Sequence, residues 1–148
     1  MPEPARSLGS GPSSVPAAKA FDGTLGAPGW GVYRILVAED DAEMRRLVVE
    51  ILRKDGHEVL EAEDGRGLVA ALADSLSFPA LDLIVSDVRM PVHNGLEVLE
   101  QLAQGRLSVI LMTAFADEET RRRAARLGAV LLDKPITVST LRNAVNDS

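Results

Sequence analysis

Polar side chains follow four short apolar runs of this 148-residue sequence, each at the point where the run ends. An acidic group, a lone carboxylate, a hydroxyl and an ammonium come after these runs in turn: Glu39-Asp40-Asp41, Asp87, Thr113 and Lys134. Each has an ordinary structural explanation, since an acidic residue after a strand commonly caps the next helix and a lysine is usually solvated. Four separate runs would not be expected to supply a compatible set by chance, so we interpret them as one site.

The chemistry of such a set is metal-assisted phosphoryl transfer. Carboxylates a few ångströms apart repel one another, and a hard divalent cation such as Mg²⁺, which prefers oxygen ligands, relieves this repulsion. A carboxylate can also act as a nucleophile and form an aspartyl phosphate. A lysine ammonium can then neutralise phosphoryl oxygens, and a hydroxyl can donate a hydrogen bond to them. The residues therefore predict an acidic Mg²⁺ site that accepts a phosphoryl group.

Five apolar runs of strand length alternate with five helical periodicities. The expected strands are 35–38, 58–60, 81–86, 109–112 and 130–132. Apolar residues at helical spacing mark helices over 44–52, 68–76, 96–102 (ending near Gly105), 117–127 (closed by Gly128) and 138–145. This alternation predicts an α/β fold with a five-stranded parallel sheet, doubly wound, with helices on both faces. Ligands of such sheets bind beyond the carboxyl ends of the strands, where the polar residues fall.

Composition divides the chain and limits its partners. Residues 1–33 hold five of the eight prolines and six of the twelve glycines, which predicts a flexible tail before a domain over 34–148. Trp30 and Tyr33 interrupt this tail, and we expect them to pack against the domain edge, with a partner-binding patch as the alternative. The net charge of −6 gives no electrostatic footprint for nucleic acid. Without cysteines, a signal peptide or a membrane-spanning apolar run, a soluble cytoplasmic protein is expected.

Four longer stretches resemble, in order and spacing, the receiver domains of two-component response regulators. They are ILVAEDDAEMRRL, LDLIVSDVRMPVHNGLEVL, VILMTAFAD and LLDKP, and the resemblance covers residues 34–148. It implies the flavodoxin-like fold with strand order 2-1-3-4-5. The implied function is that of a phosphoacceptor signalling module.

The resemblance assigns a role to each metal-site residue. Asp87 is the phosphoacceptor and a Mg²⁺ ligand, while Glu39 and Asp40 match the acidic pair that holds Mg²⁺. Asp41 falls one place later and is expected to cap the following helix. Arg89 is expected to offer its backbone carbonyl to the metal.

Other positions match residues that contact the phosphoryl group. Thr113 is expected to bind a phosphoryl oxygen and report phosphorylation, next to a small Ala114 that leaves the acceptor accessible. Lys134 is expected to pair with the phosphoryl group, before a Pro135 that typically follows a cis bond. Arg89 and Phe115 flank the phosphoryl group, where a guanidinium and a bulky ring are expected to slow hydrolysis.

The sequence departs from the family pattern in three places. The first metal carboxylate is Glu39 rather than Asp, and the segment from Gly128 to Lys134 is one residue short. Leu131 occupies the usual aromatic switch position, and we expect this leucine to stay buried in both states because exposing it costs roughly 2 kcal/mol. Phosphorylation remains expected, whereas the usual switching route is in question. We interpret His57 and His93 as solvated loop residues.

These residues favour a signalling module over an enzyme with turnover. The implied donor is a histidine kinase or a phosphotransfer protein, and the output partner is unknown. A homodimer is the further expectation, through the face formed by helix 117–127, strand 130–132 and helix 138–145. One alternative is a pseudo-receiver that binds partners without phosphorylation. The other is a phosphotransferase or phosphatase with an Asp nucleophile, which Arg89 argues against because such enzymes need an acid/base Asp at that place.

Overall fold

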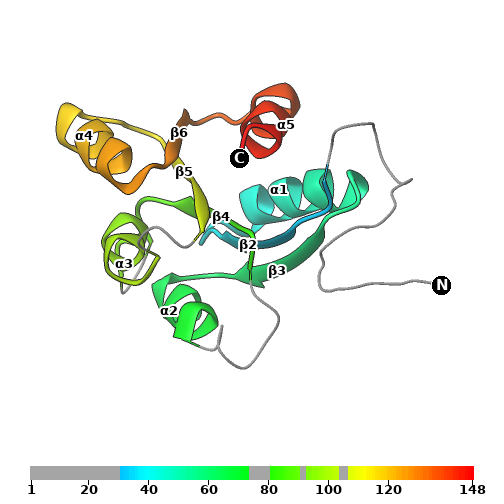
Figure 1. Cartoon of the computed structure of the whole chain (residues 1–148), viewed down its shortest axis with the longest axis horizontal. Helices are drawn as coiled ribbons and strands as arrows, with labels where there is room; N and C mark the ends of the chain where they lie inside the picture. The colour runs from blue at the N-terminus through cyan, green and yellow to red at the C-terminus, as the bar shows by residue number, and fades with distance from the viewer. Residues whose placement is uncertain (1–30, 74–80, 91–92, 104–106) are drawn as a thin grey trace. The chain divides into compact units, whose positions relative to one another are not determined.

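The computed structural model of the chain describes residues 31–73, 81–90, 93–103 and 107–148. Strands and helices alternate along these residues, and all five predicted strand–helix units are present (Figure 1). The elements are β2 (Arg34–Ala38), α1 (Ala42–Lys54), β3 (Glu58–Ala62), α2 (Gly65–Ala73), β4 (Leu83–Asp87), α3 (Gly95–Leu102), β5 (Ser108–Thr113), α4 (Glu118–Leu127), β6 (Val130–Asp133) and α5 (Val138–Asn146).

The five strands form one parallel sheet in the order β3-β2-β4-β5-β6. In chain order this is the predicted 2-1-3-4-5 arrangement, so the flavodoxin-like fold is confirmed. The reversal of strand order lies between β2 and β4, which pair with Ala38 opposite Ser86. Such a reversal leaves a crevice beyond the carboxyl ends of the two strands, because their connections leave in opposite directions.

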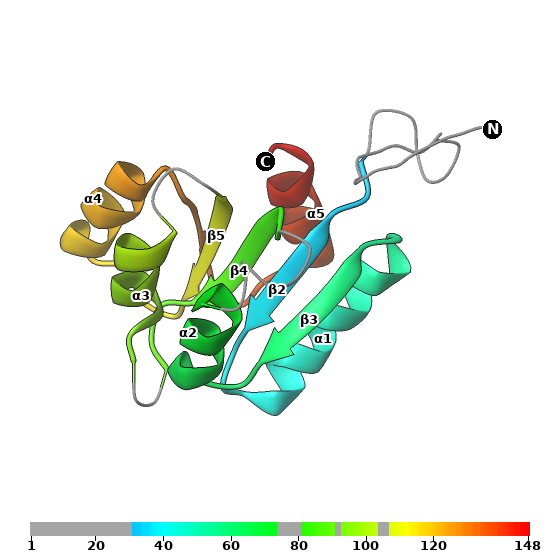
Figure 2. The same cartoon turned by 60° about the horizontal axis from the view of Figure 1, so that its bottom comes forward.

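Two hydrophobic cores cover the two faces of the sheet. Successive strand residues point to opposite faces, so Ile35 and Val37 enter one core while Leu36 and Ala38 enter the other. Helices α1 and α5 cover the first face, and α2, α3 and α4 cover the second (Figures 1 and 2). Because β2 and β4 are buried on both faces, they read in the sequence as continuous apolar runs.

Capping residues fix where α1 and α4 begin and where α4 ends. The Asp41 carboxylate accepts hydrogen bonds from the backbone N–H groups of Glu43 and Met44. Asp41 is therefore the N-cap of α1, and the Asp40 carboxylate is not needed for that role. Asp117 caps α4 in the same way, through the N–H of Thr120. Gly128 ends α4 in the left-handed conformation, as its place after the helical periodicity predicted.

The expectation for His57 was wrong. This side chain is only 8% exposed, its ring stacks on Tyr33 at 5.3 Å between ring centroids, and its Nδ1 accepts a hydrogen bond from the Tyr33 backbone N–H. Burial lowers the pKa of His57 below its ordinary value, although nearby Asp55 opposes this shift. A histidine in a turn is buried here because the residue preceding β2 folds over it. His93 is exposed, as expected.

Several predictions fall outside the described residues. They are the tail over 1–30 with Trp30, the extension of the second helix to Leu76, and the helix end near Gly105. In the described part of the chain, no helix has the length and apolar character needed to cross a membrane.

Candidate functional site

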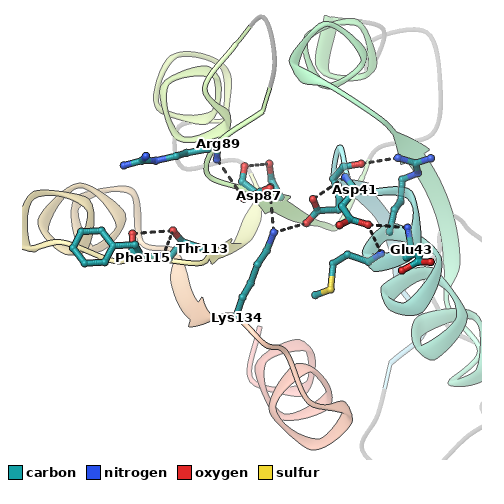
Figure 3. Close-up of polar contacts among 11 residues, drawn as sticks. Asp41, Glu43, Asp87, Arg89, Thr113, Phe115 and Lys134 are labelled. Carbon is teal, nitrogen blue, oxygen red and sulfur yellow. Dashed lines mark hydrogen bonds and ion pairs between the residues drawn. The ribbon is translucent and has the colours of Figure 1, made fainter.

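The parallel sheet brings the predicted site residues to one edge. Glu39 follows β2, Asp87 ends β4 and Thr113 ends β5, with Asp87 opposite Met112 and Thr113 opposite Asp133 in the strand register. Lys134 comes directly after β6. The ends of four strands therefore meet where the sequence predicted a common site (Figure 3).

Three carboxylates form a cluster that suits a hard cation. Glu39, Asp40 and Asp87 each offer one oxygen, and these oxygens all lie within 4.8 Å of one another. Glu39 and Asp87 are buried, whereas Asp40 is exposed. Oxygen donors on one partly open side are what Mg²⁺ requires, since it keeps several waters in its coordination shell. The residues present thus fit the predicted metal.

Lys134 bridges the two buried carboxylates. Its ammonium Nζ lies 2.9 Å from Glu39 Oε1 and 3.2 Å from Asp87 Oδ2, and Figure 3 shows it reaching toward Asp87. Burial alone would lower the pKa of Lys134, but the hydrogen bond to Glu39 and the charge of Asp87 raise it above its ordinary value. The lysine is therefore a fixed positive charge beside the candidate nucleophile.

Burial raises the pKa of Glu39, whereas burial alone would lower that of Lys134. Desolvation raises the pKa of Glu39 to about 7, against the hydrogen bonds from Lys134 and from the Asp41 backbone N–H, which lower it. The charge of Asp87 adds to the upward shift. Near neutral pH this carboxyl group is therefore partly protonated, and a bound cation would favour its ionised form.

Backbone groups orient the two buried carboxylates further. The Arg89 N–H donates to Asp87 Oδ1 at 3.3 Å, and the Asp41 N–H donates to Glu39 Oε2 at 3.1 Å. Each carboxylate thus has one oxygen on Lys134 and the other on a backbone amide. The expected role of the Arg89 carbonyl as a metal ligand remains a prediction.

Thr113 lies at the same edge, but its hydroxyl is engaged elsewhere. Thr113 Oγ1 donates to the Phe115 carbonyl at 3.0 Å and accepts from the Phe115 N–H at 3.2 Å. Phe115 is 68% exposed and its ring points away from Asp87, and Arg89 is exposed as well (Figure 3). The phosphoryl-contacting roles of Thr113, Arg89 and Phe115 remain predictions.

The region from β6 to Pro135 agrees only in part with what was expected. Leu131 is half-buried against the core on the α2–α3–α4 face, so the expectation of a buried leucine is too strong. It lies on β6, an edge strand with one neighbour, which leaves part of the side chain uncovered. The peptide bond between Lys134 and Pro135 is cis, as the resemblance implied.

Sequence reasoning missed two residues that shape this edge. Gly95 packs so closely on the acceptor that an added Cβ would collide with the Asp87 carbonyl oxygen and lie 2.8 Å from Ser86 Oγ. Arg45 donates from Nη1 to the Glu39 carbonyl oxygen at 2.7 Å. Gly95 carries only the weak signal of a glycine at a helix start, and Arg45 reads as an ordinary helix-surface cation.

Known proteins share sequence with the part of the chain that forms the sheet and its helices. Residues 35–146 match the model of the protein family described as "Response regulator receiver domain". The transcriptional regulatory protein PdtaR of Mycobacterium tuberculosis is 35% identical over 114 residues, which are 76% of this chain and 54% of PdtaR. The chain therefore spans about half the length of that relative.

Solved structures show the same fold. The chemotaxis protein CheY4 of Vibrio cholerae is 29% identical, with a TM-score of 0.66 over 79% of this chain and 98% of CheY4. The receiver domain of the response regulator Ssk1 from Saccharomyces cerevisiae, solved with the histidine phosphotransfer protein Ypd1, has a TM-score of 0.68. That match covers 80% of this chain and 89% of the other, and at 21% identity it is a likeness of fold.

Proposed function

Because this chain belongs to the response regulator receiver domain family, we propose that it is a phosphoacceptor module of a two-component system, phosphorylated on Asp87 with Mg²⁺. One observation carries the proposal above the others. The Asp87 carboxylate lies within 4.8 Å of two further carboxylates and 3.2 Å from the Lys134 ammonium. A nucleophile, a cation site and a fixed positive charge are thus in contact at one edge of the sheet.

The proposed step is transfer of a phosphoryl group from a phosphohistidine. An Asp87 carboxylate oxygen attacks phosphorus, the phosphorus–nitrogen bond to the donor histidine breaks, and an acyl phosphate forms. Lys134 already contacts Asp87 Oδ2, so its ammonium can move onto a phosphoryl oxygen with little displacement. Mg²⁺ bound to Glu39, Asp40 and Asp87 would supply neutralisation of the phosphoryl charge.

Glu39 and Thr113 must each change partners for this step. Glu39, with its pKa near 7, loses its proton when a cation binds, and the burial that raised this pKa makes its ionised form a strong ligand. The Thr113 hydroxyl must leave the Phe115 backbone before it can reach a phosphoryl oxygen. That exchange of hydrogen bonds is the proposed signal.

The proposed partners follow from the same chemistry. The donor is a histidine kinase or a histidine phosphotransfer protein in the cytoplasm, and the receiver domain of Ssk1 offers a precedent of the same fold with a partner of the second kind. Receiver domains are signalling modules, so output passes to a further protein or to a second copy through the α4–β6–α5 face. Residues 1–33 form the proposed tail before this domain.

Phosphorylation by a small-molecule donor tests the proposal directly. Wild-type protein incubated with Mg²⁺ and acetyl phosphate is expected to gain one phosphoryl group by intact mass, and hydroxylamine is expected to remove it. Asp87→Asn is expected to gain none, because an amide is not a competent nucleophile. Asp133→Asn is the matched control, since this exposed carboxylate ends β6, which β5 separates from the strand of Asp87, and is expected to leave labelling intact.

Two outcomes would count against this function. Normal labelling of Asp87→Asn would move the acceptor to another residue. No labelling of wild-type protein, with no response to Mg²⁺ or beryllofluoride, would favour phosphorylation-independent partner binding instead. The local bonding of Thr113 and the absence of a ring at Leu131 are the observations that agree with that alternative.

A further inference from the structure

Arg45 lies on the first turns of α1, yet its guanidinium contacts the loop that carries the metal carboxylates. Its Nη1 donates to the Glu39 carbonyl oxygen at 2.7 Å, and its Nε lies 3.3 Å from Glu61 Oε1 on β3. The side chain is only 18% exposed. An arginine at a helix surface normally extends into solvent, so this position calls for a separate explanation.

The carbonyl that Arg45 contacts belongs to the peptide bond between Glu39 and Asp40. On the other side, the Glu39 N–H donates to the Ala62 carbonyl oxygen at 3.0 Å. The backbone on both sides of the Glu39 side chain is therefore fixed by hydrogen bonds to other elements. The Arg45 hydrogen bond opposes rotation of the Glu39–Asp40 peptide, which joins the two residues that carry these carboxylates.

The guanidinium is itself held in place. Glu61 contacts Arg45 through one oxygen and lies 3.7 Å from Arg53 Nη2 through the other. Glu61 stands opposite Val37 in the sheet register, so its backbone is fixed beside β2. Arginine suits this arrangement because its planar group donates in two directions at once, which a lysine ammonium on a flexible stem does less well.

We propose that Arg45 is a positioning residue for the Mg²⁺ site, fixing the peptide that joins two of its three carboxylates. This inference rests on the proposed function, because it requires that Glu39, Asp40 and Asp87 bind Mg²⁺. Residues that orient metal ligands without touching the metal typically change metal affinity when they are replaced. Loss of the Arg45 side chain is expected to weaken Mg²⁺ binding roughly tenfold.

Charge alone predicts the opposite result. A guanidinium near the site repels a divalent cation, so its removal by itself would strengthen Mg²⁺ binding. The sign of the change therefore separates positioning from simple electrostatics. Arg46 is the matched control, because it carries the same charge on the same turn, is exposed, and its side chain has no hydrogen-bond or ion-pair partner among the described residues.

The experiment is a titration with Mg²⁺ alone, without any phosphodonor. Amide resonances of Asp40 and Asp87 would be followed by NMR in wild type, Arg45→Met, Arg45→Lys and Arg46→Met. We expect about tenfold weaker binding for Arg45→Met, an intermediate value for Arg45→Lys, and wild-type affinity for Arg46→Met. Glu61→Gln, which weakens the outer contact, is expected to change affinity in the same direction by less.

Unfolding by urea without Mg²⁺ separates positioning from general stability. An Arg45→Met protein that is less stable but binds Mg²⁺ with unchanged or higher affinity would overturn the inference. Were this variant to unfold, wild-type affinity in both Arg45→Lys and Glu61→Gln would overturn it equally. A wild type that binds no Mg²⁺ would overturn the proposed function as well, whereas normal binding by wild type and Arg45→Met together would remove only the role of Arg45.

Discussion

The acceptor side and the output side of the sheet edge are held together differently. On the acceptor side, Lys134 joins Glu39 and Asp87 across strands that are far apart in the sequence. On the output side, the Thr113 hydroxyl bonds, among the residues that the structure describes, only to the backbone of Phe115, two residues later in its own loop. The first side is thus held by charged contacts between strands, whereas the second meets it through a backbone hydrogen bond, from the Lys134 N–H to the Thr113 carbonyl oxygen at 2.8 Å.

Charge explains the difference. Buried carboxylates repel one another unless a cation lies between them, so the acceptor side is under strong electrostatic constraint before any ligand arrives. The output side carries a neutral hydroxyl and an exposed ring, which leave it free to change. A phosphoryl group can shift the equilibrium only through contacts that differ between two arrangements, and Thr113 is where such a difference is available.

The largest expected effect comes from removing the lysine that joins the two buried carboxylates of the acceptor side. In Lys134→Ala the carboxylates lose a charged hydrogen-bond donor, which is expected to lower the free energy of unfolding by about 2 kcal/mol. Mg²⁺ binding should persist, since the lysine competes with the cation for Glu39 and Asp87. Beryllofluoride should no longer shift the amide resonances of residues 114–117.

Lys54→Ala removes an exposed lysine at the end of α1 and is the control for charge. It is expected to leave stability, Mg²⁺ binding and the loop response near wild type. A full beryllofluoride response in Lys134→Ala would mean that the acceptor side and the output side communicate without the Lys134 side chain.

The next effect is a pH dependence of the acceptor side. The pKa of Glu39 is raised to about 7 in the folded chain, so the stability linked to this group is full below its ordinary value of 4.5 and is lost as the pH rises through 7. Mg²⁺ must displace the proton, so its apparent affinity should rise about tenfold between roughly pH 6 and pH 8.

Calorimetric or NMR titrations at several pH values measure this dependence. Glu39→Gln has no titrating group at this position, and its weaker affinity should vary little over the same range. An equal pH dependence in wild type and Glu39→Gln would assign the displaced proton to a different group.

The lifetime of the phosphoryl group tests how the two sides share control of hydrolysis. Arg89→Asn and Phe115→Asn are each expected to shorten the lifetime severalfold, because a guanidinium and a ring hinder approach of water. Arg89 should matter more, since its backbone already contacts Asp87 and the Phe115 ring is largely exposed. Decay of the labelled protein by intact mass gives the rates, with Arg121→Asn on α4 as control. Unchanged or longer lifetimes would contradict the idea.

The smallest expected effect is at Leu131. This half-buried leucine has no aromatic ring to move and no hydroxyl that could form a hydrogen bond in an outward position. Beryllofluoride should therefore shift the resonances of residues around Thr113 and in the loop before α4, while Leu131 stays in place. Methyl chemical shifts of Leu131 with and without beryllofluoride measure this, and Leu132 on the same strand is the internal reference. A large movement of Leu131 between buried and exposed positions would show that the output side switches as a whole strand.

Much of the fold was predictable because its signals are local. Five apolar runs alternate with five helical periodicities, and each half of the pattern depends only on neighbouring residues. The cap at Asp41 and the left-handed Gly128 likewise follow from residue type and position. The residue types at the strand ends were readable for the same reason, because a polar residue that ends an apolar run is visible without any long-range contact.

The sequence by itself determined which side chains stand at the edge of the sheet, but only the tertiary structure decided what each one contacts. His57 is buried because Tyr33 folds over it, and Arg45 turns inward because the Glu39 carbonyl and Glu61 are within reach. Lys134 meets Glu39 across a separation of 95 residues. Such contacts depend on how two hydrophobic cores align the strands, and no local pattern of residues carries that information.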